Sequence, residues 1–170
     1  MKTSAHISHD GRYRYDLTRE WGNGMWEGPG PTIHVLFVML NPSKADATVD
    51  DPTIRKCIGF AERWGYGGIT VVNLFAYRST DPRKLGSLSA DERVGPLNDA
   101  VIKETVTNLY GTVVAAWGSL TPRWARERAE KVLLMLGMKV KCLRKTKDGQ
   151  PGHPLYAPYM DLADLKALLP

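Results

Sequence analysis

Cysteines are scarce in this chain, and long apolar runs are missing. The two cysteines, Cys57 and Cys142, form no CxxC pair and show no cysteine–histidine spacing of a zinc site, so we expect buried thiols. No apolar run approaches the roughly 20 residues that a membrane-spanning helix needs. The first six residues, MKTSAH, lack the apolar core of a signal peptide. We therefore expect a cytoplasmic protein without a membrane partner.

A strong excess of one charge is also missing, because 23 lysines and arginines stand against 18 aspartates and glutamates, for a net charge of +5. This mild positive charge permits a polyanionic partner but does not identify one. With 43% hydrophobic residues, the composition is that of a globular protein. We expect residues 1–170 to form a single α/β domain, with a loose segment at 1–12.

Six apolar residues, Val35 to Leu40, run without interruption and stop at Asn41-Pro42-Ser43. Such a run predicts a strand buried on both faces, as in a parallel sheet, and the proline ends it. In open parallel sheets the ligand crevice lies beyond the carboxyl ends of the strands. We therefore place Asn41, Pro42 and Ser43 at a candidate site, next to the charged loop 44–51.

Strands and helices alternate along the rest of the chain. Glycines and prolines mark a loop at 22–31, and Asp51 with Pro52 marks the start of a helix. Leu97 opens the apolar face of a later helix. We expect strands at 33–40, 69–75, 112–117 and 139–143, and helices at 52–64, 97–109, 122–136 and 161–169. The order predicts a three-layer α/β/α fold with a mostly parallel four-stranded sheet, plus an N-terminal edge strand or hairpin at 13–21.

Such a sheet brings four strand ends to one rim. The rim is rich in amide, imidazole, aromatic and guanidinium groups, which suits a planar, hydrogen-bonding ligand such as a nucleobase. The candidate binding residues there, besides those already named, are Lys44, Asn73, Phe75, Arg78, Trp117, Gly118 and Leu155, and the candidate catalytic residues are Asn41, Asp46 and His153.

Each candidate has a structural alternative. Asn41 can hold a water or sugar hydroxyl, or it can cap its own turn. Asp46 is a candidate general base or a solvated loop carboxylate, whereas Asp51 is most simply a helix cap. Asn73 lies inside an apolar strand and needs a partner, either a base edge or the backbone. His153 can donate to a developing negative charge, or it is a surface loop histidine.

Two basic residues and one aromatic have the same ambiguity. Lys44 and Arg78 can contact phosphate, or they are simply solvated. Trp117 either lines a pocket or packs in the core. No glycine-rich phosphate loop follows a strand, so a dinucleotide fold is not indicated.

Several of these motifs together resemble family 1643 of the domains of unknown function, over roughly residues 13 to 158. The matching segments are Met39-Leu40-Asn41-Pro42-Ser43, Asp46, Asp51-Pro52-Thr53-Ile54-Arg55, Gly65-Tyr66-Gly67, Val72-Asn73-Leu74-Phe75-Ala76-Tyr77-Arg78, Asn98-Asp99, Ala116-Trp117-Gly118 and His153-Pro154-Leu155. This resemblance brings no established activity.

The order of the rim motifs is also similar to that of the uracil-DNA glycosylase superfamily. That resemblance implies a glycosylase-like fold in which Asn41 positions the attacking water and Asn73 reads the base. Trp117-Gly118 matches the Trp-Gly that ends a third strand. His153 would supply the oxyanion donor, and Leu155 the apolar wedge that fills the gap left by a flipped nucleotide.

The leading hypothesis is therefore a nucleobase-recognising protein of glycosylase-like fold that cleaves a base–sugar bond in nucleic acid or nucleotide. It needs no metal and no organic cofactor. Two alternatives stay open. One is a module that binds a nucleotide or modified base without turnover, and the other is a magnesium-dependent nucleotide-processing enzyme that uses the Asp46 loop.

Overall fold

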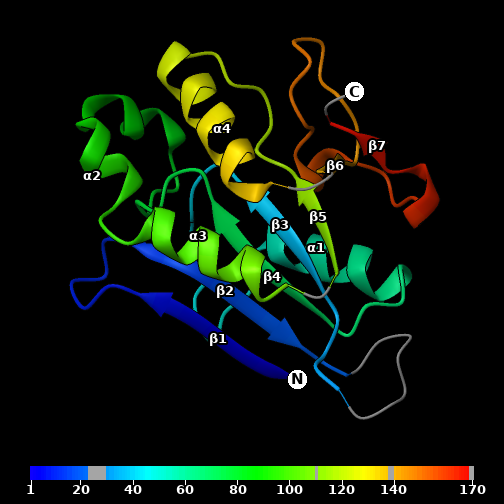
Figure 1. The fold of residues 1–170 in the computed structure, drawn as a ribbon. Helices are drawn as coiled ribbons and strands as arrows, with labels where there is room; N and C mark the ends of the chain where they lie inside the picture. The colour runs from blue at the N-terminus through cyan, green and yellow to red at the C-terminus, as the bar shows by residue number, and fades with distance from the viewer. Residues whose placement is uncertain (23–29, 110, 138–139, 169–170) are drawn as a thin grey trace.

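A seven-stranded mixed sheet runs through the molecule, with its strands in the order β1-β2-β4-β3-β5-β6-β7 (Figure 1). The computed structural model describes residues 1–22, 30–109, 111–137 and 140–168. The strands are β1 (Lys2–Ile7), β2 (Arg14–Glu20), β3 (His34–Met39), β4 (Gly68–Asn73), β5 (Gly111–Ala115), β6 (Lys141–Cys142) and β7 (Lys166–Ala167). The helices are α1 (Pro52–Arg63), α2 (Ala90–Val94), α3 (Asn98–Thr107) and α4 (Arg123–Leu136).

The centre of the sheet is parallel. β3 pairs in parallel with β4 on one side and β5 on the other, and β5 pairs in parallel with β6. Antiparallel strands flank this centre, with β2 and β1 beyond β4, and β7 beyond β6. The predicted α/β class is confirmed. The N-terminal strand expected at 13–21 is present as β2. The sheet is larger than predicted, however, because β1 and β7 bring it to seven strands and make it mixed.

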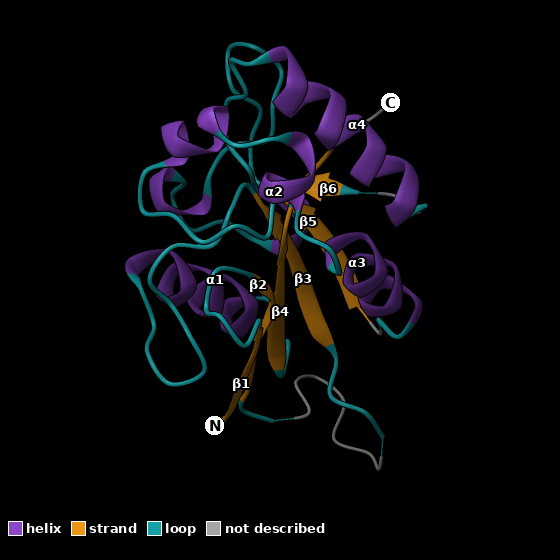
Figure 2. Ribbon diagram, turned by 90° about the vertical axis from the view of Figure 1, so that its left-hand side faces the viewer, coloured by secondary structure: helices purple, strands orange, loops and turns teal. Residues whose placement is uncertain are grey.

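Helices cover both faces of the sheet, with α1 on one face and α3 and α4 on the other (Figure 2). The uninterrupted apolar run of β3 serves both faces at once. Val35 and Phe37 pack into the core on the α1 side. Leu36 and Val38 pack into the core beneath α3 and α4. Alternate residues of a strand point to opposite faces, so a strand covered on both sides needs an apolar residue at every position.

Several sequence expectations at the two ends of the chain are wrong. Residues 1–12 were expected to be loose, but Lys2–Ile7 forms β1, whose polar side chains suit an exposed edge strand. Instead of a helix at 161–169, a 3₁₀ turn at Leu162–Asp164 is followed by β7. Residue 169, the end of the expected helix, lies outside the described residues, as do 23–29 of the predicted loop 22–31 and 139 of the predicted strand.

Side-chain caps start two of the helices, whereas Leu97 does not face inward as expected. Asp51 caps α1, and its Oδ1 accepts a hydrogen bond of 2.9 Å from the backbone N–H of Ile54. Ser89 and Glu92 form a reciprocal capping box that starts the five-residue helix α2. Leu97, expected to face inward, is 47% exposed because it lies at the N-cap of α3.

A bulge in β2 changes the direction of one side chain. The register between β1 and β2 shifts from His6↔Asp16 to Ile7↔Arg14, which leaves Tyr15 as the extra residue. Arg14 consequently reaches the α1 side of the sheet, where its Nη1 donates to the backbone carbonyl of Ala45 at 2.7 Å. Among the described residues, no helix has the length and hydropathy required to cross a membrane.

Candidate functional site

A cavity of about 460 Å³ lies beyond the carboxyl ends of the central strands. The arrowheads of β3 and β5 point to the same end of the sheet (Figure 1). Residues 39–41 at the end of β3 and residues 117–119 after β5 line the cavity, together with Asp51, Thr53 and Ile54 at the start of α1. This is the position at which open parallel sheets bind their ligands.

The fourth wall of the cavity comes from the late loop, through Arg144, Thr146, His153 and Tyr156. Two hydrogen bonds fasten this loop to the end of β5. The backbone N–H of Gly118 donates to the carbonyl of Pro151 at 2.8 Å, and the indole Nε1 of Trp117 donates to Oε1 of Gln150 at 3.0 Å. Gly118 has φ of +80°, a left-handed conformation that favours glycine. The Trp117-Gly118 pair therefore determines where the loop sits.

His153 presents a nitrogen to the cavity in a defined protonation state. Its Nδ1 accepts a hydrogen bond of 3.3 Å from the backbone N–H of Leu155, so the proton of the neutral ring is on Nε2. Burial lowers the pKa of His153, an effect that the nearby carboxylate of Asp51 partly offsets. At neutral pH the ring is therefore uncharged and acts as a hydrogen-bond donor through Nε2.

Asn41 lines the cavity but its amide nitrogen is already engaged. Nδ2 donates to the backbone carbonyls of Pro42 at 3.0 Å and of Ser79 at 2.9 Å. The amide group therefore ties its own turn together, which is one of the two alternatives from the sequence, and Asn41 also lines the cavity. What it offers a ligand is the acceptor Oδ1.

Asp51 and Arg14 belong to the cavity, although the sequence did not point to them as site residues. Asp51 was assigned to the helix cap alone, and it both caps α1 and lines the cavity. Arg14 is 2% exposed, and burial lowers its pKa to about 10. A polar residue in a half-buried strand is normally expected on the solvent face, so only the bulge at Tyr15 explains its position, and no sequence signal marks that bulge.

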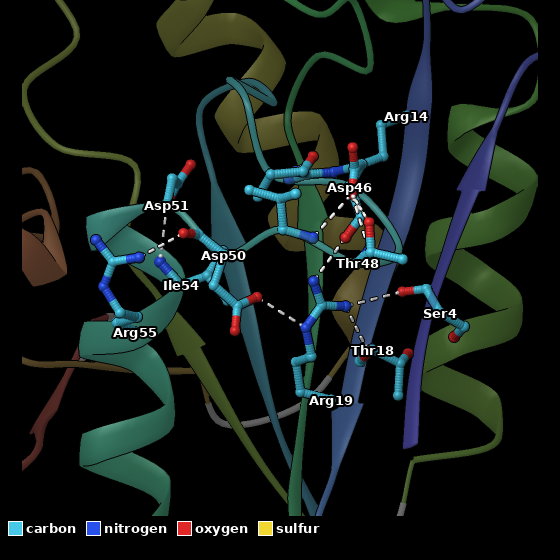
Figure 3. A network of polar contacts seen from close by, with 12 residues as sticks. Ser4, Arg14, Thr18, Arg19, Asp46, Thr48, Asp50, Asp51, Ile54 and Arg55 are labelled. Atoms are coloured by element: carbon cyan, nitrogen blue, oxygen red, sulfur yellow. Dashed lines mark hydrogen bonds and ion pairs between the residues drawn. The ribbon is translucent and has the colours of Figure 1, made fainter. Parts of the chain in front are cut away.

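Asp46, a predicted catalytic residue, and Asn73, the predicted base-reading residue, do not line the cavity. Asp46 turns its carboxylate back onto its own loop, where Oδ1 accepts from the backbone N–H groups of Thr48 at 2.8 Å and Val49 at 2.9 Å (Figure 3). These bonds lower the pKa of Asp46, which is therefore an ionised cap of the turn. Asn73 is 1% exposed and lies in the register opposite Met39, with both polar side-chain atoms unpartnered within the described structure.

Of all the predicted site residues, some line the cavity and others lie outside it. Asn41, Ser43, Trp117, Gly118 and His153 line the cavity together. Of those outside it, Pro42 is buried, Lys44 is exposed, and Phe75 lies in the core with its ring edge against Trp124. Arg78 donates through Nη1 to the carbonyl of Gly11 at 3.1 Å, and Leu155 is 40% exposed beside His153.

Two other possible sites in the described part of the chain, a metal centre and a cavity at the opposite end of the sheet, are less favourable. Within the described residues, no group of three or more His, Cys, Asp or Glu side chains is placed to hold a metal ion. A second cavity, of about 530 Å³, is lined by Glu20, His34 and Thr70 among others. It lies at the amino ends of β3 and β4, away from the edge at which parallel sheets normally bind ligands.

Comparison of the sequence with protein families gives a match over residues 14–155 to the family described as "Protein of unknown function (DUF1643)". The matched region begins at Arg14 and ends just after His153, so it includes all the cavity-lining residues named above except Tyr156. The comparisons found no curated protein and no solved structure that matches the chain.

Proposed function

The chain belongs to this family, and we propose that its cavity binds a nucleobase and hydrolyses the bond between that base and its sugar. One observation carries the proposal most directly: Asn41 and His153, which are far apart in the sequence, line one cavity with Trp117 at the carboxyl ends of parallel strands. An acceptor, a neutral donor and an aromatic surface are the groups that recognition of a planar heterocycle requires.

The proposed reaction is hydrolysis by a bound water. The water lies between Oδ1 of Asn41 and the carboxylate of Asp51 and attacks the anomeric carbon as the carbon–nitrogen bond breaks. The bonding electrons leave with the base, and the Nε2–H of His153 donates a hydrogen bond to the atom that takes the charge. The proton of the water passes to Asp51, which is the carboxylate that lines this wall.

The likeness of the rim motifs to the uracil-DNA glycosylase superfamily supports this assignment at three positions. Asn41, Trp117 and His153 all line the cavity, as the roles proposed for Asn41 and His153 require. The cavity position of Asp51 makes it a better general base than Asp46, which is held in its turn. Leu155, exposed beside His153, is suitably placed to wedge into a duplex from which a nucleotide has been flipped.

Oligonucleotides that carry uracil, a thymine mismatch or hydroxymethyluracil test the reaction. After incubation, alkali treatment breaks the strand wherever a base has been removed. We expect breaks with the wild-type protein and a rate lower by roughly 100-fold or more for His153→Leu, since one donor to the leaving group is lost. His9→Leu, which changes an exposed histidine of the N-terminal region, is the matched control and should cleave normally.

The same assay separates the alternatives. Saturable nucleotide binding without strand breaks would replace the glycosidase by a binding module. Breaks that require magnesium and disappear on chelation would favour a metal-dependent reaction. Cleavage that His153→Leu leaves unchanged would show that the cavity is not the site of the reaction.

A further inference from the structure

Three arginines are buried in the described part of the chain, namely Arg14, Arg19 and Arg128. A guanidinium stays charged in proteins, so burying one is costly unless an anion and hydrogen-bond acceptors surround it. The way in which each of the three is compensated therefore indicates its purpose.

Two of the buried arginines have carboxylate partners. Arg19 places Nε 2.8 Å from Oδ1 of Asp50 and donates through Nη2 to the carbonyl of Asp46 at 2.6 Å (Figure 3). Arg128 places Nη2 2.6 Å from Oδ1 of Asp99 and donates through Nε to the carbonyl of Leu74 at 2.7 Å. Both side chains are structural, because each joins separate segments through a neutralised charge.

Arg14 is different. It comes from the same strand as Arg19 and reaches the same loop, where Nη1 donates to the carbonyl of Ala45 at 2.7 Å (Figure 3). No carboxylate of the described residues lies within the 4.0 Å of an ion pair, and its Nε has no partner there. The positive charges of Arg78 and Arg19 lower the pKa of Arg14 further. Among the acids, Asp51 raises that pKa most.

Arg14, which has no carboxylate partner, also lines the cavity. Arg144 and the first turn of α1 line the same cavity. Asp51 forms no ion pair with Arg14: its Oδ1 accepts from the N–H of Ile54, and its other oxygen is left for the water of the proposed reaction. A cation that is 2% exposed, incompletely paired and at the wall of a cavity is arranged for an anion that arrives with the ligand.

We propose that Arg14 is the binding group for a phosphate of the ligand, which makes the substrate of the cavity a phosphorylated one. This inference rests on the proposed function, because it specifies the ligand further, as a nucleotide and not only a nucleobase. Because Arg14 is almost fully enclosed, it can meet only the phosphate of the nucleotide whose base occupies the cavity, whether that nucleotide is free or belongs to a strand. Arg144, an exposed residue that also lines the cavity, contacts the same anion or the sugar beside it.

Calorimetric titration of the full chain with a nucleoside, its 5′-monophosphate, inorganic phosphate and an unphosphorylated oligonucleotide tests the proposal. We expect the monophosphate to bind more tightly than the nucleoside. Arg14→Met, which roughly keeps the length of the side chain and removes the charge, should weaken the affinity for the monophosphate by roughly 30-fold or more. The affinity of Arg14→Lys should fall between those of the wild type and Arg14→Met, because lysine keeps the charge but lacks the forked donors of the guanidinium. Arg123→Met, which removes an equal charge from an exposed position on α4, is the control and should bind as the wild type does.

Thermal unfolding without ligand distinguishes binding from a structural role. For a binding residue, Arg14→Met unfolds at the wild-type temperature or above, since an unpaired buried charge has been removed. A variant that loses stability but keeps its affinity for the monophosphate would overturn the proposal, as would a nucleoside that binds as tightly as its monophosphate. Phosphate binding that depends on Arg14, with no preference for any nucleoside, would retain the anion site and contradict base recognition instead.

Discussion

The side-chain amide of Asn41 donates a hydrogen bond of 2.9 Å to the backbone carbonyl of Ser79. The bond connects the segment that follows β3 to the segment that follows β4, and the N–H of Ser79 returns a bond of 2.9 Å to the carbonyl of Pro42. The two parallel strands are thus fastened together just beyond their carboxyl ends. One wall of the cavity is therefore held in place by a residue that itself lines the cavity.

This connection predicts that Asn41 affects stability as well as ligand binding. Asn41→Asp keeps the shape of the side chain but removes the donor and places a carboxylate against two carbonyls. We expect a loss of about 1–3 kcal/mol in the free energy of unfolding, measured by urea denaturation. Ser43→Ala, in the same wall of the cavity, is the control and should cost less than about 1 kcal/mol. Equal stability of Asn41→Asp and the wild type would mean that the bond contributes nothing.

Two buried asparagines give a second prediction because they differ in their partners. Nδ2 of Asn98 donates to the carbonyls of Asn73 at 3.0 Å and Leu74 at 3.1 Å, whereas the side chain of Asn73 has no partner in the described structure. Asn98→Ala should therefore cost about 2 kcal/mol or more, and Asn73→Ala less than that. Urea titrations of the two variants decide the point. If Asn73→Ala is the more damaging change, its amide holds an essential contact of the core.

The same variant tests base reading by Asn73. Because Asn73 does not line the cavity, Asn73→Ala should leave nucleotide affinity within about threefold of the wild type, a change of less than 1 kcal/mol. A large loss of affinity with normal stability would restore the sequence hypothesis that Asn73 reads the base.

Two histidines predict how stability depends on pH. Burial lowers the pKa of both His34 and His153 from the ordinary value of 6.5. The unfolded chain therefore binds protons at these two histidines more readily than the folded chain does. The two neutral histidines lower the free energy of unfolding by nothing above pH 6.5, and protonation reduces that free energy as the pH falls below 6.5. Protonation of His153 also removes the acceptor for the N–H of Leu155. Unfolding free energies measured between pH 5 and 8 should show this decline, and His153→Gln should flatten it while the exposed-site control His9→Gln does not. A stability that rises as the pH falls would contradict the assignment.

The two thiols should be inert in the folded protein. Cys57 and Cys142 are free and fully buried, and burial raises the pKa of both. Thiolate formation and access are both needed for reaction, so a thiol reagent at pH 8 should label neither cysteine until denaturant is added. Rapid labelling of the native protein would show that the described core opens on the timescale of the assay.

The parts of the fold that the sequence predicts well are those with local signals. The apolar run of Val35–Met39 required cover on both faces, and Asp51-Pro52 marked the start of α1 by its own capping chemistry. β1 escaped prediction for the opposite reason. Its sequence, KTSAHI, is polar because an edge strand buries little, so pairing with β2 and not hydrophobicity keeps it in place.

The candidate site divides along the same line. Residues directly at strand ends, such as Asn41 and Trp117, could be placed from the order of the elements. Side-chain direction could not, and it separates Asp51, which faces the cavity, from Asp46 in the same loop, which faces its own backbone. Arg14 depends on a one-residue shift in pairing between two strands, a property of both strands together that neither sequence reveals alone.

A crystal structure of the protein with a bound nucleoside monophosphate is the decisive experiment for ligand binding. We expect the base beside Trp117, within hydrogen-bonding distance of Nε2 of His153, with the phosphate on the guanidinium of Arg14. A nucleotide found instead in the cavity of His34 and Thr70, or one that leaves the cavity beyond β3 and β5 empty at saturating concentration, would contradict it.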